Sequence, residues 1–173
     1  GKCMSKRAVI ITGPGFQDEE YVYPYYRLLE AGFKVDVATK DGAVVIGKYG
    51  NPARATMPTT DLDAHNFDMV LVPGGFEAPD RVRLLPEVLQ FIREMDSAGK
   101  LVASICHGPW VLISAGITRG RKMTGYWSIE ADIRNSGADY QHKVPVVIDK
   151  NLITSPHYND NPAFMKAVVN YFD

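Results

Sequence analysis

The chain has 173 residues, of which 46% are hydrophobic and 23% charged, a balance typical of one globular domain with a sizeable core. We therefore expect a single domain over residues 1–173. The 19 basic and 20 acidic residues are spread along the chain and leave a formal net charge of −1, which excludes an obvious nucleic-acid footprint. No apolar run is long enough to cross a bilayer, and no signal-peptide core is present. We expect a cytoplasmic protein that binds neither nucleic acid nor membrane.

The two cysteines, Cys3 and Cys106, are too few for a disulfide framework. The four histidines are scattered, and the chain contains no Cys-x-x-Cys, no His-x-x-x-His and no paired glutamates at helical spacing. We therefore expect neither a metal ion nor another cofactor.

Strand and helix patterns alternate through the first hundred residues. A first apolar strand is broken at the Gly13-Pro-Gly15 turn, which lacks the full glycine spacing and the lysine of a phosphate loop. The next helix begins with the acidic residues Asp18, Glu19 and Glu20, as the helix dipole favours. Hydrophobic periodicity predicts strands over 7–12, 33–38 and 69–73, helices over 18–30 and 86–98, and a short strand over 44–46 in a loop-rich excursion from the main sheet.

The same alternation continues in the second half. A short apolar, partly β-branched run over 101–105 predicts a buried parallel strand, and the apolar helix after it stops at Gly116. Beyond it we expect a strand near Met123, a helix over 129–135, a hairpin of strands over 144–148 and 152–154, and a last helix over 162–172. Alternating elements with short links predict a flavodoxin-like three-layer α/β/α sandwich with a mostly parallel central sheet.

Cys106 is placed where an α/β protein presents a nucleophile, because it ends an apolar strand and is followed at once by His107 and Gly108 at a helix start. A free cysteine is more often a small buried hydrophobe, but the unpaired amides of a new helix would stabilise a thiolate here. We therefore expect the pKa of this thiol to fall from about 8.5 toward ~5. His107 alone is weaker evidence, since it could merely cap or pack.

Ligands of such sheets bind beyond the carboxyl ends of the strands, where residues 13–20, 74–80 and 106–109 should meet. Aromatic residues later in the chain could select a substrate there or could simply pack. We do not expect His157 to be catalytic. These aromatic candidates are Trp110, Tyr126, Trp127, His157 and Tyr158.

Several motifs carry a resemblance to a known family. They are Ala103-Ser-Ile-Cys-His-Gly108, Val72-Pro-Gly-Gly75, Ala78-Pro-Asp-Arg-Val-Arg83, Glu20-Tyr-Val-Tyr-Pro24 and Gly120-Arg-Lys122. Together they are similar to the ThiJ/PfpI family, close to its intracellular protease I branch, within the class I glutamine amidotransferase-like superfamily. The resemblance extends from Lys6 to the last helix.

The resemblance implies a role for each site residue. Cys106 would be the nucleophile, His107 its base partner and Glu20 a carboxyl group beside the sulfur. The backbone amides of Gly75 and His107 would hold an oxyanion. Glu20 could instead be an ordinary first-turn acid that the helix dipole favours.

One segment departs from the family pattern. The family has a glutamate where this chain has Asp80, and that acid reaches the histidine across a subunit interface. Aspartate is shorter by a methylene, and the chain carries one extra residue nearby, so Glu77 could substitute or Asp80 could pair with Arg81 or Arg83. The resemblance implies a homodimer or a larger even homo-oligomer.

Two functions use these residues. The first is a cysteine-dependent enzyme in stress protection that acts on a small carbonyl compound, as a glutathione-independent glyoxalase or deglycase, or on a peptide, as a protease or amidase. Small-carbonyl chemistry ranks slightly above proteolysis, because a cramped site suits a small aldehyde better. The alternative is a non-catalytic redox-responsive stress or chaperone-like protein that senses through oxidation of Cys106 beside Glu20. The sequence does not separate the two.

Overall fold

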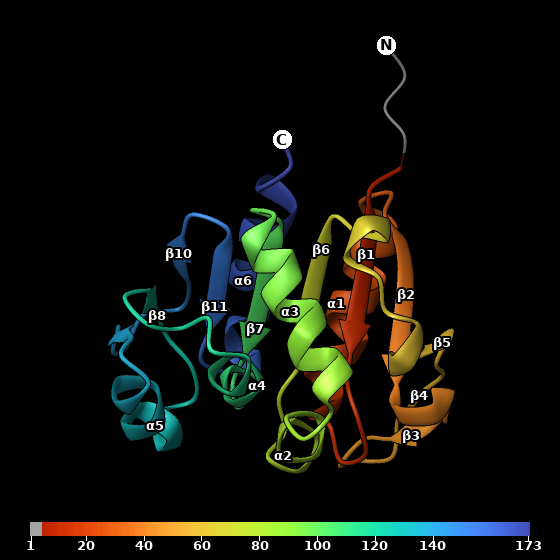
Figure 1. Ribbon diagram of the computed structural model, residues 1–173, viewed down its shortest axis with the longest axis horizontal. Helices are drawn as coiled ribbons and strands as arrows, with labels where there is room; N and C mark the ends of the chain where they lie inside the picture. Colours follow the sequence, from red (N-terminus) through yellow and green to blue (C-terminus); the bar gives the residue numbers. More distant parts are fainter. Residues whose placement is uncertain (1–4) are drawn as a thin grey trace.

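A mostly parallel sheet forms the centre of the computed structural model, which describes residues 5–173 and leaves Cys3 outside the described residues. The strand order is β10-β11-β7-β6-β1-β2-β5, and every neighbouring pair except β10 and β11 is parallel. Helices cover both faces of this sheet (Figure 1). The predicted three-layer α/β/α sandwich is therefore confirmed.

The central strands agree with the sequence predictions to within one or two residues. They are β1 (Arg7–Ile11), β2 (Lys34–Thr39), β6 (Met69–Val72) and β7 (Leu101–Ile105). The predicted hairpin forms β10 (Val147–Asp149) and β11 (Leu152–Ser155), and β10 starts three residues later than expected. Pro145, just before it, has no N–H to donate to a ladder.

Several two-residue strands complete the sheets. The predicted excursion forms its own antiparallel pair, β3 (Val45–Ile46) with β4 (Pro52–Ala53). The expected strand near Met123 is β8 (Lys122–Met123), which pairs with β9 (Asp139–Tyr140). At the sheet edge, β5 (Met57–Pro58) pairs with β2. The strands β4, β5 and β9 are too short to show an alternating pattern, so they were not predicted.

The helices lie in two layers. On one face α1 (Asp18–Glu30) packs against α6 (Asn161–Asn170), and on the other α3 (Pro86–Ser97) packs against α4 (Pro109–Ala115). The short α2 (Glu77–Val82) and α5 (Glu130–Asn135) both contact α4. Short 3-10 turns span Lys40–Gly42, Thr59–Asp61, Ala64–Asn66, Trp127–Ile129 and Tyr158–Asp160. No helix within residues 5–173 is both long enough and apolar enough to cross a membrane.

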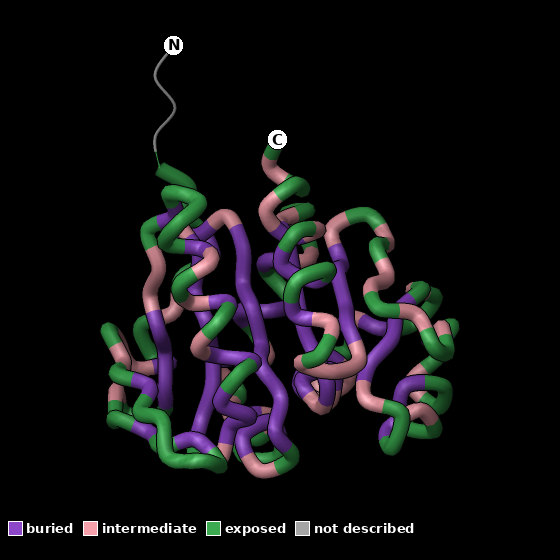
Figure 2. The backbone as a smooth tube through the Cα atoms, turned by 180° about the vertical axis from the view of Figure 1, so that it is seen from behind, coloured by how far each residue is buried: buried purple, intermediate pink, exposed green. Residues whose placement is uncertain are grey.

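Alternation along each strand fills two separate cores. Ile10 of β1 shares a core with Leu28 of α1 and Phe164 of α6, whereas the next residue, Ile11, shares the opposite core with Phe91 of α3. Successive strand side chains point to opposite faces, so a strand covered on both sides must be apolar throughout. Figure 2 shows this as buried strands inside a more exposed helical surface.

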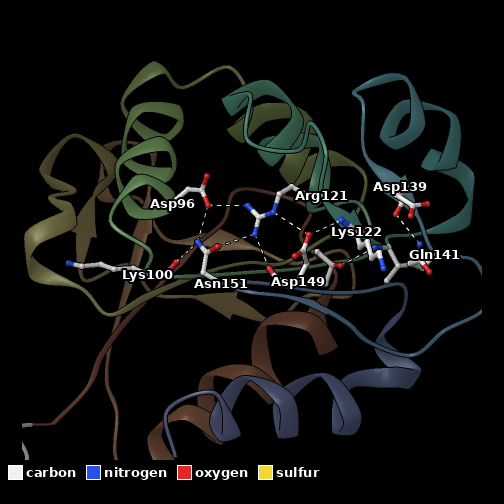
Figure 3. A network of polar contacts seen from close by, with 10 residues as sticks. Asp96, Lys100, Arg121, Lys122, Asp139, Gln141, Asp149 and Asn151 are labelled. Atoms are coloured by element: carbon white, nitrogen blue, oxygen red, sulfur yellow. Dashed lines mark hydrogen bonds and ion pairs between the residues drawn. The ribbon is translucent and has the colours of Figure 1, made fainter.

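A polar network around Arg121 links α3 to the β10–β11 hairpin (Figure 3). The Arg121 guanidinium donates to Asp96 Oδ1 (3.2 Å), Asn151 Oδ1 (3.0 Å) and the backbone oxygen of Asp149 (2.9 Å). The Asn151 amide donates to Asp96 Oδ1 (2.9 Å) and to the backbone oxygen of Lys100 (3.0 Å). The network therefore ties α3, β8 and the β10–β11 hairpin together.

Candidate active site

The three segments predicted to gather at the carboxyl edge of the sheet do meet. The Gln17 amide donates to the backbone oxygen of Gly74 (3.1 Å), and the Gly74 amide donates to Glu20 Oε1 (2.9 Å). Cys106 lies beside both, because a Cβ added to Gly74 would stand 2.7 Å from the Cys106 Cβ and 2.6 Å from Glu20 Oε1. Only a glycine fits at position 74, so the bare backbone brings the thiol and the carboxyl group together.

Cys106 occupies a sharp strand-to-helix turn between β7 and α4. Its φ of 62° lies in the left-handed region, which residues with a side chain rarely adopt. A side chain at Gly108, two residues later, would collide with Ser104 and with the backbone oxygen of Val72. This geometry is that of a nucleophile elbow, in which a strained turn lifts the reactive side chain above the sheet. The residue itself is only 6% exposed.

Glu20 enters the site from the first turn of α1 and is fully buried. Burial raises the pKa of its carboxyl group to about 8, against the lowering effect of hydrogen bonds with the Gly74 amide and the Cys106 thiol. The carboxyl group is therefore mostly protonated at neutral pH. Its Oε2 atom has no well-formed hydrogen bond, and the thiol is the polar side chain beside it.

The pKa of the Cys106 thiol is raised, not lowered as the sequence predicted. Burial raises the pKa of the thiol, and a negative charge on Glu20 raises it further. Hydrogen bonds from the backbone amides of Gly75 and His107 lower the pKa but do not offset burial. The sequence showed the helix start but not the depth of the sulfur, so the predicted fall toward ~5 is wrong. Formation of the thiolate needs an adjacent base.

His107 is the base that the geometry offers. Its Nδ1 atom lies 3.4 Å from Cys106 Sγ, and its Nε2 atom lies 3.4 Å from Ser128 Oγ. Burial and the positive charge of Lys48 lower the pKa of the imidazole, and the charge of Asp132 only partly opposes them. The ring is therefore neutral at neutral pH and able to accept the thiol proton.

Neither acid proposed to face His107 reaches it within one chain. Asp80 is exposed on α2, and within residues 5–173 it forms no hydrogen bond or ion pair with the imidazole. The Glu77 carboxylate accepts instead from Arg81 Nε (2.9 Å), and Arg83 Nε donates to Ser114 Oγ (2.9 Å).

The active-site pocket has a volume of about 290 Å³ above Cys106. Tyr126 and His157, both expected near the site, line it, and Trp127 stacks on Tyr126 with ring centroids 4.1 Å apart. Trp110 meets the His107 ring edge-on at 5.0 Å. Gln17 and Phe76, which also line the pocket, belong to the predicted segments 13–20 and 74–80, whereas Lys48 and Tyr49 were missed. Within residues 5–173, no group of three or more His, Cys, Asp and Glu side chains is arranged to hold a metal ion.

Asp18 explains why Lys48 and Tyr49 lie at the pocket. Its carboxylate accepts from the backbone amides of Tyr49 (2.8 Å) and Asn51 (2.9 Å) and from the Asn51 side chain (2.8 Å). Burial raises the pKa of this carboxyl group, but these hydrogen bonds outweigh burial and lower it overall. The β3–β4 loop, which the sequence showed only as an excursion, is thereby fastened beside α1.

The sequence and the fold are similar to those of known proteins. The sequence model of the DJ-1/PfpI family matches residues 6–171. The chain belongs to the DJ-1/PfpI family. The resemblance drawn from the sequence motifs is thereby confirmed over nearly the whole chain.

Relatives within the DJ-1/PfpI family carry enzyme names. The chain is 38% identical over 163 residues to the deglycase PfpI of Pyrococcus furiosus, covering 94% of this chain and 97% of the relative. It is 36% identical over 168 residues to the putative cysteine protease YraA of Bacillus subtilis, covering 96% and 98%. The crystal structure of Drosophila melanogaster DJ-1beta, at 30% identity, superposes with a TM-score of 0.91 over 96% of this chain and 90% of that chain.

Proposed function

We propose that this protein is a Cys106-dependent enzyme that acts on small carbonyl compounds, as a glutathione-independent glyoxalase or deglycase, in stress protection in the cytoplasm. The observation that carries the proposal is the contact between His107 Nδ1 and Cys106 Sγ at 3.4 Å, beside the buried Glu20 carboxyl group. A nucleophile and a neutral base in contact are what thiol addition to a carbonyl requires. The name of the P. furiosus relative, a deglycase, supports the same chemistry.

The first step is addition of the thiol to an aldehyde. His107 accepts the thiol proton, the sulfur forms a bond to the carbonyl carbon, and the π electrons of the C=O bond move to oxygen. The amides of Gly75 and His107, which hydrogen-bond the sulfur in the resting site, are the donors available to that oxyanion. Return of the proton from His107 to oxygen gives a hemithioacetal.

A second proton transfer turns the methylglyoxal adduct into a hydroxy acid. The hydrogen on the former aldehyde carbon leaves as a proton to the base, and a proton is added at the neighbouring carbon through an enediol, which yields a lactoyl thioester of Cys106. Water then cleaves the thioester and restores the thiol, so no external oxidant is needed. Glu20 and His107 are the groups that could move this proton, and such help is worth roughly 10²–10⁴ in rate.

The size of the pocket favours a small substrate over a peptide. A volume of about 290 Å³ and a sulfur-bearing residue that is 6% exposed leave room for a compact molecule, whereas an extended peptide needs an open groove. The name of the B. subtilis relative, a putative cysteine protease, makes peptide hydrolysis the first alternative.

A redox-responsive stress protein is a second candidate. The mostly protonated carboxyl group of Glu20 lies beside the sulfur and is positioned to hydrogen-bond an oxidised form of Cys106. This reading requires Glu20 and Cys106 but assigns no task to the contact between His107 and the sulfur.

The assembly is part of the proposal. We infer a homodimer or a larger even homo-oligomer in which Asp80 of the partner subunit approaches His107. The exposed position of Asp80 and the lack of a carboxylate hydrogen-bonded to His107 within residues 5–173 support this arrangement.

Parallel assays test the reaction. The purified protein should convert methylglyoxal or glyoxal to the hydroxy acid without glutathione, and Cys106→Ala should abolish the conversion while the circular dichroism spectrum stays unchanged. Both proteins should also be given a fluorogenic peptide. Turnover of the peptide alone would establish the protease alternative, and turnover of neither substrate, with ready oxidation of Cys106 to the sulfinate, would establish the sensor.

A further inference from the structure

The active-site pocket carries one fixed positive charge. Among residues 5–173, Lys48 is the only lysine or arginine that lines it, and no aspartate or glutamate does. The lysine, arginine, aspartate and glutamate side chains that line the pocket therefore contribute one positive charge and no negative charge, and the Asp18 carboxylate lies outside this lining, on the Tyr49 amide. Its lining residues are Gln17, Lys48, Tyr49, Gly75, Phe76, Cys106, His107, Tyr126, His157 and Tyr158.

Lys48 is held in place but has no acidic partner. Its backbone amide donates to the backbone oxygen of Phe16 (2.8 Å), and Asp18 fastens the next residue, Tyr49. The ammonium group lies 5.6 Å from the ring centroids of both Tyr49 and Phe76, within the range of a cation–π contact. Within residues 5–173, Lys48 forms no ion pair. Its charge is therefore available to a ligand.

The charge of Lys48 also acts at the reacting groups. It is close enough to His107 to lower the pKa of the imidazole, and His107 touches the sulfur. A small molecule bound at Cys106 therefore lies within the field of the ammonium group. An anionic group on that molecule gains electrostatic attraction, while a neutral group gains little.

We propose that Lys48 makes the pocket selective for small aldehydes and ketones that carry a carboxylate, binding the carboxylate while Cys106 attacks the carbonyl carbon. The proposal rests on the proposed function only in taking Cys106 as the nucleophile. With a 2-oxo acid, the new bond is S–C, the π bond of C=O breaks, and the thiol proton passes through His107 to the carbonyl oxygen. The product is a hemithioacetal or hemithioketal, and nothing is oxidised or reduced.

Alkylation with a matched pair of reagents tests this selectivity without enzyme turnover. Iodoacetate and iodoacetamide have nearly the same size but differ by one negative charge. The rate of each should be measured at one pH by mass spectrometry of the peptide that contains Cys106. The ratio of the two rates cancels changes in the reactivity of the thiol itself. We expect Lys48→Met to lower the iodoacetate-to-iodoacetamide ratio about tenfold.

Two further variants serve as controls. Lys48→Arg keeps the charge and should hold the ratio within about twofold, as should Lys34→Met, because Lys34 lies at the start of β2, at the opposite end of the sheet. High salt should bring the ratio of the unsubstituted protein toward that of Lys48→Met. An unchanged ratio in Lys48→Met would overturn the proposal.

Protection by substrates gives a second measurement. Glyoxylate should slow alkylation of Cys106 by iodoacetamide, and the concentration needed for half protection should rise about tenfold in Lys48→Met. Neutral glyoxal should protect both proteins equally. Equal protection by glyoxylate in both proteins would contradict a role for Lys48. The alkylation and protection rates report on the charge of Lys48 and do not require turnover. The glyoxalase assay tests only the proposed function, so the two proposals can fail independently.

Discussion

Glu20 and Cys106 are adjacent buried acids, and ionisation of either one disfavours ionisation of the other. Burial raises the pKa of the carboxyl group to about 8 and raises the pKa of the thiol as well. The resting pair therefore keeps its protons at neutral pH, and His107, with its lowered pKa, is the nearby acceptor. The nucleophilic role proposed for Cys106 therefore requires that its proton first move to a base.

Replacing Glu20 by glutamine should make the thiol easier to ionise above neutral pH. The substitution removes the negative charge that raises the pKa of Cys106 once Glu20 ionises near pH 8. Alkylation of Cys106 by iodoacetamide should be faster in Glu20→Gln than in the unsubstituted protein above about pH 8, with little difference below about pH 7. Glu30→Gln, at the exposed end of α1, is the matched control. Identical rate profiles would show that Glu20 does not act on the sulfur.

The same carboxyl group should make stability depend on pH. Its pKa is about 8 in the folded protein and near 4.5 when unfolded, so the folded state holds the proton more tightly. The stability from that proton is complete below about pH 4.5 and is lost as pH rises through about 8. Urea unfolding should show that, as pH rises from about 4.5 to 8, the unfolding free energy of Glu20→Gln increases by several kcal/mol relative to that of the unsubstituted protein. A constant difference across the interval would contradict the buried, protonated state.

The sequence predicted that Glu20 and Cys106 meet, but not their environment. Glu20 was placed beside the sulfur by the family resemblance, and Cys106 by the strand before it and the histidine after it. The direction of the thiol pKa was wrong because burial depends on residues distant in sequence. Lys48 was missed because the hydrogen bonds of Asp18 that bring its loop to the pocket join residues 31 and 33 positions apart in the sequence.

The β3–β4 loop is the element that gives the pocket its charge, and α1 positions it. Gly47 allows the close approach, because an added Cβ there would stand 2.6 Å from Asp18 Oδ1. The hydrogen bonds of Asp18 link the first turn of α1, which also supplies Glu20, to the loop that supplies Lys48. The first turn of α1 therefore positions both Glu20 beside the sulfur and, through Asp18, Lys48 at the pocket.

Asp18→Ala should release this loop while leaving the sheet intact. Hydrogen bonds to a charged group contribute about 1.5–3 kcal/mol, but water can replace the carboxylate at the exposed Tyr49 and Asn51, so we expect a loss of about 1–2 kcal/mol in unfolding free energy. The pKa of Asp18 is lowered by folding, so this contribution is present above about pH 4 and is lost as pH falls through the lower, folded value. Urea titrations at pH 7 and pH 3 check both statements. A difference that is larger at pH 3 than at pH 7 would show that the carboxylate does not anchor the loop.

The longer elements were predictable because each one satisfies a local rule. Apart from Arg7 and Ser104, the strands β1, β6 and β7 are apolar because both of their faces are covered, and α3 repeats apolar residues at helical spacing. The six-residue α2 was not predicted, because so short a segment does not show a helical period. It matters for function, since it carries Asp80.

At the scale of the whole molecule, the polar network and the active site lie on different parts of the sandwich. Arg121 binds Asp96 of α3 and Asp149 of β10, and the two ion pairs are largely shielded from solvent. These contacts hold the antiparallel hairpin against the parallel part of the sheet (Figure 3). The neighbouring strand β11 in turn anchors the elbow, because its Ser155 oxygen accepts from the Cys106 amide (3.0 Å).

No carboxylate within residues 5–173 forms a hydrogen bond with His107. A neutral imidazole that takes a proton becomes a cation, and a carboxylate at its far nitrogen would stabilise that cation. Among residues 5–173, the one side chain within hydrogen-bond distance of His107 Nε2 is Ser128, whose hydroxyl lies 3.4 Å away. We therefore expect light scattering to show a dimer or a larger even oligomer at micromolar concentration.

If Asp80 of the partner subunit supplies the carboxylate, Asp80→Asn should lower kcat for methylglyoxal by about ten- to a hundredfold without changing the oligomeric state. Asp61→Asn, an equally exposed substitution at the end of a 3-10 turn, should leave kcat unchanged. A monomer in solution, or full activity in Asp80→Asn, would show that His107 works without an acid from a second subunit. In that case the Ser128 hydroxyl would be the only side chain oriented to hold the imidazole within the described chain.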